Sequence, residues 1–124
     1  MLRKILCLLF LLLILPVQAG ELDEIIMKNH GKIFLYLYTK DCSYCVKFNP
    51  IYEKLVKKYG QKCIFFKIDA NTERGHYLMY ETRTGYVPNV IFIDTSKQTM
   101  GRVDPVCLID EACINNTMNK FINQ

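Results

Sequence analysis

Two cysteines separated by two residues, Cys42 and Cys45, are the part of this sequence whose residue types and spacing could do chemistry most directly. They lie in the stretch YTKDCSYCVKFNP, in which Pro50 follows five residues after the second cysteine. Such a pair can be a structural disulfide, half of a metal site, or a dithiol that exchanges electrons with another molecule. The other residues of the chain discriminate among these three interpretations.

The structural and metal-binding interpretations are the weaker ones. A bridge between Cys42 and Cys45 closes a very short loop, so it would constrain the unfolded chain little. A zinc site needs a second close pair of ligands, whereas Cys107 and Cys113 are separated by five residues. Haem attachment needs a histidine after the second cysteine, and Val46 occupies that position. We therefore favour a redox-active pair that requires no metal and no dissociable cofactor.

The segments on either side of Cys42 predict how it is positioned. Residues 32–39, KIFLYLYT, are apolar on both faces, which is typical of a strand in the middle of a sheet. Residues 42–60 predict a helix that closes at Gly60. Cys42 would lie at its N-terminus, where unpaired N–H groups and the helix dipole favour the thiolate, the attacking species in disulfide exchange. Cys45 would be more shielded, which suits a resolving thiol.

Apolar spacing predicts which side chains of two helices face the sheet. For residues 42–60 these are Val46, Ile51, Leu55 and Tyr59. For a closing helix over residues 107–123 they are Ile109, Cys113 or Ile114, Met118 and Phe121.

The remaining segments alternate between helix and strand. Helices are predicted over residues 21–31 and 71–85, and strands over residues 62–70, 87–94 and 99–104. Alternation predicts an α/β fold with parallel pairing, and the last two strands form a hairpin that adds an antiparallel edge. We expect residues 20–124, which contain all of these segments, to form one domain with a single hydrophobic core.

At its two main motifs the sequence resembles the thioredoxin family. Cys42-Ser43-Tyr44-Cys45 followed by Pro50 is similar to the CxxC-x4-Pro pattern of that family. Val87-Pro88, about 46 residues after Cys42, resembles the cis-proline loop that precedes an apolar strand. FFKIDAN resembles the strand that lies between the two motifs. The resemblance covers most of the chain from about residue 33.

The resemblance implies a thioredoxin fold, a central mixed sheet of about four strands flanked by helices. It implies that Cys42 is the nucleophile, that Cys45 resolves the mixed disulfide, and that Pro88 is cis. Val87 would offer its backbone N–H and C=O to an extended substrate segment. Tyr44 projects at the helix tip and could shape the substrate groove. The implied function is a thiol–disulfide oxidoreductase acting on protein thiols or disulfides, with a redox partner protein that recycles the pair.

Three departures from cytosolic thioredoxins leave the direction of electron flow open. Asp41 stands where a tryptophan is usual, and the dipeptide between the cysteines is Ser-Tyr. Tyr36 stands where a buried acid assists proton transfer, so a carboxylate base is missing. These differences resemble exported thioredoxin-like proteins. The alternatives from other classes are a binding or adaptor module with an oxidised CxxC and, more weakly, a copper-handling protein, because paired thiolates suit Cu(I).

The N-terminus predicts export. Residues 1–19 combine a basic start, an uninterrupted apolar run and small residues before Gly20, which is the pattern of a cleaved signal peptide. The apolar run is short for a membrane span, although an uncleaved anchor is the rival interpretation. We expect a periplasmic or otherwise extracytoplasmic, secreted monomer with no membrane attachment after cleavage. The formal net charge of +4 is too small to indicate a nucleic-acid partner.

Three further cysteines follow the CxxC motif. Cys107 and Cys113 could form a structural disulfide in an oxidising compartment, provided that Cys107 precedes the last helix. Cys63 opens an apolar strand and is interpreted as a small buried hydrophobic residue. A regulatory thiol is the alternative for Cys63.

Overall fold

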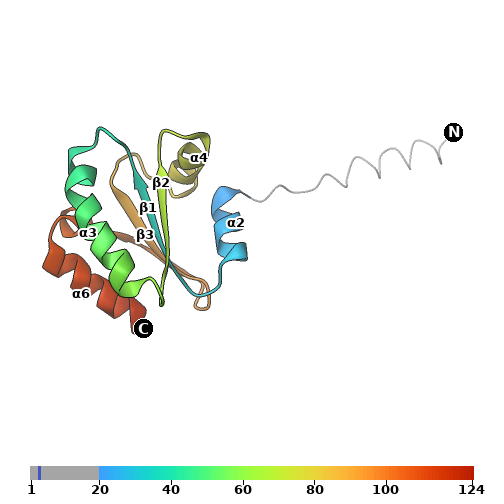
Figure 1. Ribbon diagram of the computed structural model, residues 1–124. Helices are drawn as coiled ribbons and strands as arrows, with labels where there is room; N and C mark the ends of the chain where they lie inside the picture. Colours follow the sequence, from blue (N-terminus) through green and yellow to red (C-terminus); the bar gives the residue numbers. More distant parts are fainter. Residues whose placement is uncertain (1–2, 4–19) are drawn as a thin grey trace.

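The computed structural model describes Arg3 and residues 20–124 (Figure 1). Apart from Arg3, the predicted signal peptide, residues 1–19, lies outside the described residues. No helix in the described part of the chain combines the length and hydropathy that a membrane crossing requires.

The order of elements is close to the predicted order. The described residues form α2 (Glu21–Lys28), β1 (Lys32–Tyr38), α3 (Ser43–Tyr59), β2 (Ile64–Asp69), α4 (Glu73–Glu81), β3 (Asn89–Asp94), β4 (Thr99–Val103), α5 (Pro105–Leu108) and α6 (Glu111–Ile122). The one added element is α5, because the predicted closing helix is divided in two.

The four strands make one mixed sheet in the order β2-β1-β3-β4. β1 pairs in parallel with β2, whereas β3 is antiparallel to both β1 and β4. The mixed four-stranded sheet is confirmed, but parallel pairing is wrong for β3. Tyr38 pairs with Asp69 and Leu37 pairs with Asn89, so the connection from β2 to β3 begins and ends at the same end of the sheet. The chain therefore enters β3 in the opposite direction.

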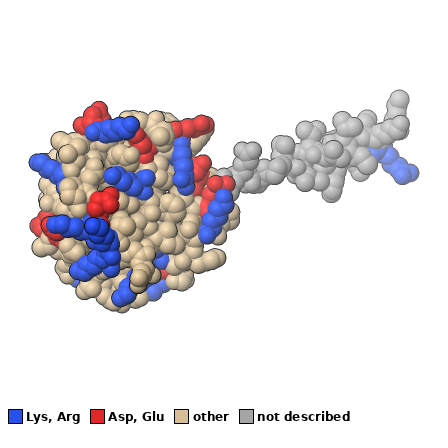
Figure 2. Space-filling model, in the orientation of Figure 1, with Lys and Arg blue, Asp and Glu red and all other residues tan. Residues whose placement is uncertain are grey.

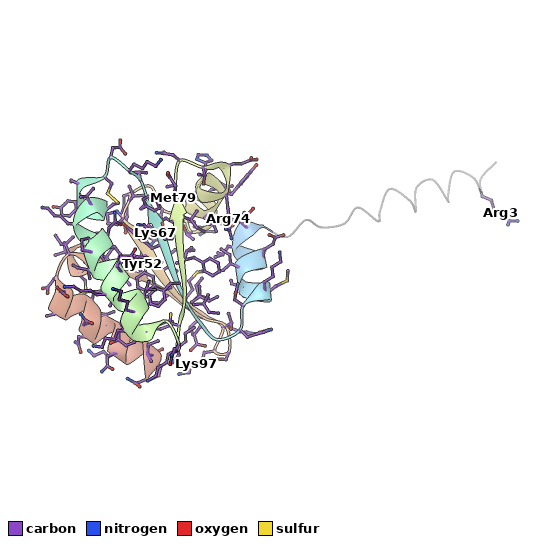
Figure 3. All side chains as sticks on the ribbon, viewed as in Figure 1. Arg3, Tyr52, Lys67, Arg74, Met79 and Lys97 are labelled. Atoms are coloured by element: carbon purple, nitrogen blue, oxygen red, sulfur yellow. A yellow bond between two sulfur atoms is a disulfide. The ribbon has the colours of Figure 1, made fainter. Side chains whose placement is uncertain are left out.

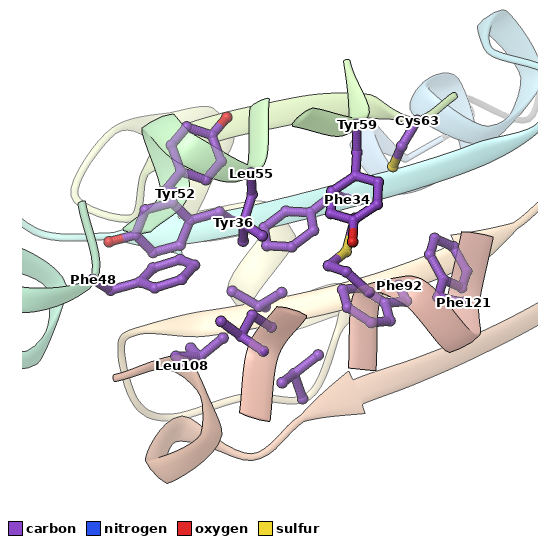
Figure 4. Close-up of a cluster of buried hydrophobic side chains, with 14 residues drawn as sticks. Phe34, Tyr36, Phe48, Tyr52, Leu55, Tyr59, Cys63, Phe92, Leu108 and Phe121 are labelled. Carbon is purple, nitrogen blue, oxygen red and sulfur yellow. The ribbon is translucent and has the colours of Figure 1, made fainter. Parts of the chain in front are cut away.

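Helices cover both faces of the sheet (Figure 1). On one face, α3 and α6 pack over an aromatic cluster that includes Phe34 and Tyr36 of β1 (Figure 4). On the other face, α2 and α4 pack over an aliphatic cluster that includes Leu35 and Leu37 of the same strand. Alternate side chains of β1 thus pack into the hydrophobic clusters on the two faces of the sheet, which explains why its sequence is apolar at consecutive positions.

The helix α3 begins and ends where the sequence predicts. Its fully or nearly buried residues are Cys45, Phe48, Tyr52, Leu55 and Tyr59. At its C-terminus, the backbone N–H of Gly60 donates to the carbonyl oxygen of Val56. The predicted inward stripe is wrong at Val46, which is 58% exposed, whereas Leu55 and Tyr59 are buried and Ile51 packs against the same cluster. The aromatic rings of Phe48 and Tyr52 are buried on this face as well.

The C-terminal segment breaks between α5 and α6. The side chain of Asp104 accepts a hydrogen bond from Val106 N, and that of Asp110 accepts one from Cys113 N, so each helix has its own N-cap. Ile114, Met118 and Phe121 are buried as predicted. Leu108 is the fully buried side chain near the break, a place that the predicted stripe assigned to Ile109.

A disulfide between Cys107 and Cys113 spans this break, with Cα atoms 5.3 Å apart. Cys107 lies in α5, so it precedes the last helix as the disulfide requires.

Charged side chains of both signs are interspersed on the face shown in Figure 2. Some form ion pairs between elements, including Lys54 of α3 with Glu111 of α6, at 3.0 Å. Arg74 of α4 pairs with Glu21 of α2, at 3.1 Å. These exposed ion pairs join neighbouring helices, and each contributes little to the stability of the fold.

Candidate active site

Cys42 and Cys45 form a disulfide at the point where β1 gives way to α3, with Cα atoms 5.1 Å apart. The two sulfur-bearing residues differ in exposure. Cys42 is half-buried, whereas Cys45 has no exposed surface. A partner molecule can therefore approach Cys42 but not Cys45.

Cys42 is also the N-cap of α3. Its Sγ accepts a hydrogen bond from the backbone N–H of Cys45 at 3.1 Å. Its carbonyl oxygen accepts the first bond of the helix, from Val46 N at 3.0 Å. The first turn carries no acidic residue. Both the N–H group and the positive end of the helix dipole therefore act on Cys42 Sγ, and both favour negative charge there.

The Val87–Pro88 motif reaches the same end of the sheet. The peptide bond between these residues is cis, which is the geometry that the resemblance leads one to expect. Pro88 is buried and Val87 is half-buried. The next residue, Asn89, pairs with Leu37 near the end of β1. The proline loop and the start of α3 are therefore both connected to the final residues of β1.

A small polar network supports the proline loop, and sequence reasoning missed it. Asn89 and Thr82 are both buried, and Asn89 Nδ2 lies 3.5 Å from Thr82 Oγ1. The guanidinium of Arg102 donates to the carbonyl oxygen of Thr82. These contacts join the end of α4, the start of β3 and the edge strand β4. The sequence signal that could have indicated this network is the polar residue Asn89, which directly follows Pro88 and opens an apolar strand.

Tyr44 lies between the two cysteines and is 50% exposed. The ammonium nitrogen of Lys47 lies 5.5 Å from the centre of its ring, which is within range of a cation–π contact. The ring is thus a surface feature beside the disulfide, as expected of a residue at the helix tip.

Tyr36 of β1 and Asn49 of α3 form a partly buried polar contact. The hydroxyl of Tyr36 donates to Asn49 Oδ1 at 2.9 Å and lies 3.4 Å from the carbonyl oxygen of Cys45. Tyr36 has no exposed surface. Burial raises its pKa well above the ordinary value, so the hydroxyl keeps its proton and acts as a donor. The sequence indicated only that Tyr36 is not a carboxylate, and the role of Asn49 was missed, although it follows Cys45 by one helical turn.

Cys63 is a free thiol and is only 4% exposed. Burial raises its pKa to about 12. It belongs to the aromatic cluster under α3, so it packs as the small buried hydrophobic residue that the sequence predicts. Among the described residues, no three His, Cys, Asp or Glu side chains are grouped so that they could hold a metal ion.

Comparison with known proteins agrees with this geometry. A family model described as thioredoxin matches residues 14–118. A search of curated proteins gave no significant match. Several solved thioredoxins share the fold, at identities that by themselves support the fold alone.

Three of these structures illustrate the likeness. Thioredoxin from Fasciola hepatica is 21% identical, with a TM-score of 0.65 over 81% of this chain and 90% of its own. The thioredoxin pre-protein from Schistosoma mansoni is 20% identical, with a TM-score of 0.65 over 84% and 92%. The germline-specific thioredoxin Deadhead from Drosophila melanogaster is 20% identical, with a TM-score of 0.64 over 83% and 98%. Taken with the CxxC disulfide at the start of α3, the family model shows that this chain belongs to the thioredoxin family.

Proposed function

We propose that this chain is an exported thiol–disulfide oxidoreductase that exchanges disulfides with protein substrates through Cys42 and Cys45. The observation that carries the proposal is the asymmetry of the pair. Cys42 is partly exposed, and its sulfur accepts a hydrogen bond from a backbone N–H at the N-terminus of α3. Cys45 is fully buried one turn further into the same helix. This asymmetry suits one attacking thiol and one resolving thiol.

The reductive cycle follows from these positions. The Cys42 thiolate attacks a substrate disulfide, so a bond forms between Cys42 Sγ and one substrate sulfur while the other substrate sulfur leaves as a thiolate. Cys45 then loses its proton to water, and its thiolate attacks Cys42 Sγ. The Cys42–Cys45 bond re-forms, the second substrate thiolate leaves, and two electrons have passed to the substrate. The reverse sequence donates the disulfide, and a redox partner protein resets the pair in either direction.

Substrate would be held beside the disulfide by the proline loop. The backbone N–H and C=O of Val87 can pair with an extended substrate segment as an added strand does. Pro88 has no N–H of its own, so it does not compete for the acceptors of that segment. The exposed ring of Tyr44 would line the other side of the groove and contact apolar substrate side chains.

Export to an oxidising compartment is part of the proposal. Its support is the signal-like pattern of residues 1–19 and the second disulfide, Cys107–Cys113, since disulfides of this kind persist in extracytoplasmic proteins. The mature chain would begin at Gly20 and act as a monomer in the periplasm or an equivalent space.

Reduction of insulin disulfides by residues 20–124 tests the proposal. The wild-type chain, Cys42→Ala and Cys45→Ala are compared, and the reduction potential of the CxxC pair is measured to assign direction. Wild type should reduce insulin catalytically, and Cys42→Ala should fall to the uncatalysed rate. Equal rates for wild type and Cys42→Ala would instead favour the binding-module alternative.

A further inference from the structure

The fully buried hydroxyl of Tyr36 makes its hydrogen bonds to the helix that carries the disulfide. It donates to Asn49 Oδ1 at 2.9 Å and lies 3.4 Å from the carbonyl oxygen of Cys45. The ring is fixed from two sides, with its centre 4.9 Å from that of Phe48 and 5.3 Å from that of Tyr52 (Figure 4). The hydroxyl therefore has a defined position beneath the first turns of α3.

This bond orients the amide of Asn49. A tyrosine hydroxyl that keeps its proton takes an acceptor, so the amide oxygen faces Tyr36 and the NH2 group faces away. Within the described part of the chain, no protein group accepts a hydrogen bond from Asn49 Nδ2. Asn49 and Cys45 are four residues apart on α3, which places their side chains on the same face of the helix.

Cys45 needs such a donor during exchange. Its side chain is fully buried, and a buried thiolate is costly unless donors or positive charge stabilise it. Besides Cys42, the charged residues closest to the pair along the chain are Lys40, Asp41 and Lys47, all exposed. The ionisable groups that pack around the Tyr36 ring are Tyr38, Tyr52 and Lys67. The Lys67 ammonium lies over the rings of Tyr36, Tyr38 and Tyr52, at 4.9–5.9 Å from their centres. Figure 3 labels two of these residues, Lys67 and Tyr52. Lys67 is exposed, so its charge is screened by solvent.

We infer that Asn49 Nδ2 donates a hydrogen bond to the Cys45 thiolate during resolution of the mixed disulfide, and that Tyr36 is the positioning residue that orients the Asn49 amide. The inference rests on the proposed exchange reaction and concerns its second step. In that step the Cys45 proton goes to water, the Cys45–Cys42 bond forms, and the bond from Cys42 to the substrate breaks. The amide lowers the cost of the charge that appears on Cys45.

Rapid mixing of the reduced chain with one equivalent of 5,5′-dithiobis(2-nitrobenzoate) separates the two steps. Attack by Cys42 releases the first thionitrobenzoate, and resolution by Cys45 releases the second. The variants are Asn49→Leu, Tyr36→Phe and the double variant, with Tyr52→Phe as a control that removes a neighbouring hydroxyl. Thermal unfolding of each variant is recorded in parallel.

We expect Asn49→Leu to slow the second release by about tenfold or more and to shift its pH profile upward by about one unit. The first release should stay within about twofold, because the inference concerns only the second step. Tyr36→Phe should also slow the second release, and it should cause no additional slowing in the Asn49→Leu background. Tyr52→Phe should change neither release.

The double variant distinguishes this role from a structural one. In Asn49→Leu the Tyr36 hydroxyl keeps only the longer 3.4 Å contact with the carbonyl oxygen of Cys45, and the double variant removes this hydroxyl, so stability should recover relative to Asn49→Leu alone. The second release should nevertheless stay slow. Recovery of the second release together with stability, or a second release unchanged in Asn49→Leu, would overturn the inference. Absence of the first release in wild type would instead contradict the proposed function.

Discussion

The backbone N–H of Cys45 donates a hydrogen bond to Cys42 Sγ at 3.1 Å, so one cysteine of the pair caps the helix that buries the other. The cysteine of the pair that is partly exposed therefore also satisfies a backbone donor of α3. Local helix stability and the reactivity of Cys42 depend on the same contact.

The capping contact predicts a difference between two variants that both lack the disulfide. In a Cys45→Ala background, Cys42→Ser retains a side-chain acceptor and Cys42→Ala does not. We expect the alanine variant to have the lower free energy of unfolding, by about 1 kcal/mol. Urea unfolding of the two chains measures this difference, and equal stabilities would show that the side chain of residue 42 does not cap α3.

The Cys107–Cys113 disulfide is expected to stabilise the chain without taking part in exchange. Replacing both residues by serine should lower the free energy of unfolding by about 2 kcal/mol, since the bridge closes a short loop. The rate of insulin reduction should be unchanged. Thiol counting on the oxidised, denatured chain from Gly20 onward should find one thiol, that of Cys63. Three thiols would mean that Cys107 and Cys113 are not paired.

Cys63 predicts a pH dependence of stability. Burial raises its pKa from 9.0 to about 12, so above pH 9 the unfolded chain releases a proton that the folded chain retains. The stabilisation is therefore complete below about pH 9 and is lost as the pH rises toward 12. Cys63→Ala should lose stability less steeply than wild type between pH 8 and pH 11. Parallel slopes for the two chains would mean that the thiol titrates normally in the fold.

At Gly75 in α4, helix propensity and packing predict opposite effects of a change to alanine. Alanine is favoured over glycine in a helix by about 1 kcal/mol. A Cβ at position 75 would, however, overlap the backbone carbonyl of Asp69, which cannot move without shifting β2. We expect Gly75→Ala to lower the free energy of unfolding by about 1–3 kcal/mol. Gly101→Ala is the matched control, since nothing lies within 4 Å of its added Cβ, and it should change stability by less than about 0.5 kcal/mol.

Local signals were sufficient for much of the fold and for the core of the site. The continuous apolar run of β1 identified the central strand because its residues enter two cores. The strand-to-helix junction placed Cys42 at the N-terminus of α3, and the side chain of Thr72 caps α4 near the start of the helix predicted over residues 71–85. Each of these features depends on residues that are close together in the sequence.

Features that depend on distant residues were not predicted. The direction of β3 depends on which end of the sheet the 70–88 connection returns to, and no local pattern encodes that. The prediction for the inner face of α3 was wrong at Val46, because apolar spacing did not reveal that Phe48, two residues later, packs against the sheet. The contact of Tyr36 with Asn49 joins a strand to a helix, so it becomes visible only when the two are packed.

Trapping of a mixed disulfide tests the central claim most directly. Reduced Cys45→Ala and reduced Cys42→Ala, each as residues 20–124, are mixed with a peptide that contains one disulfide, and the adducts are mapped by mass spectrometry. The account predicts that Cys45→Ala accumulates a stable adduct on Cys42, and that Cys42→Ala forms little adduct because Cys45 is buried. Adducts that form equally on either remaining cysteine, or only on Cys45, would contradict the assignment of Cys42 as the attacking thiol.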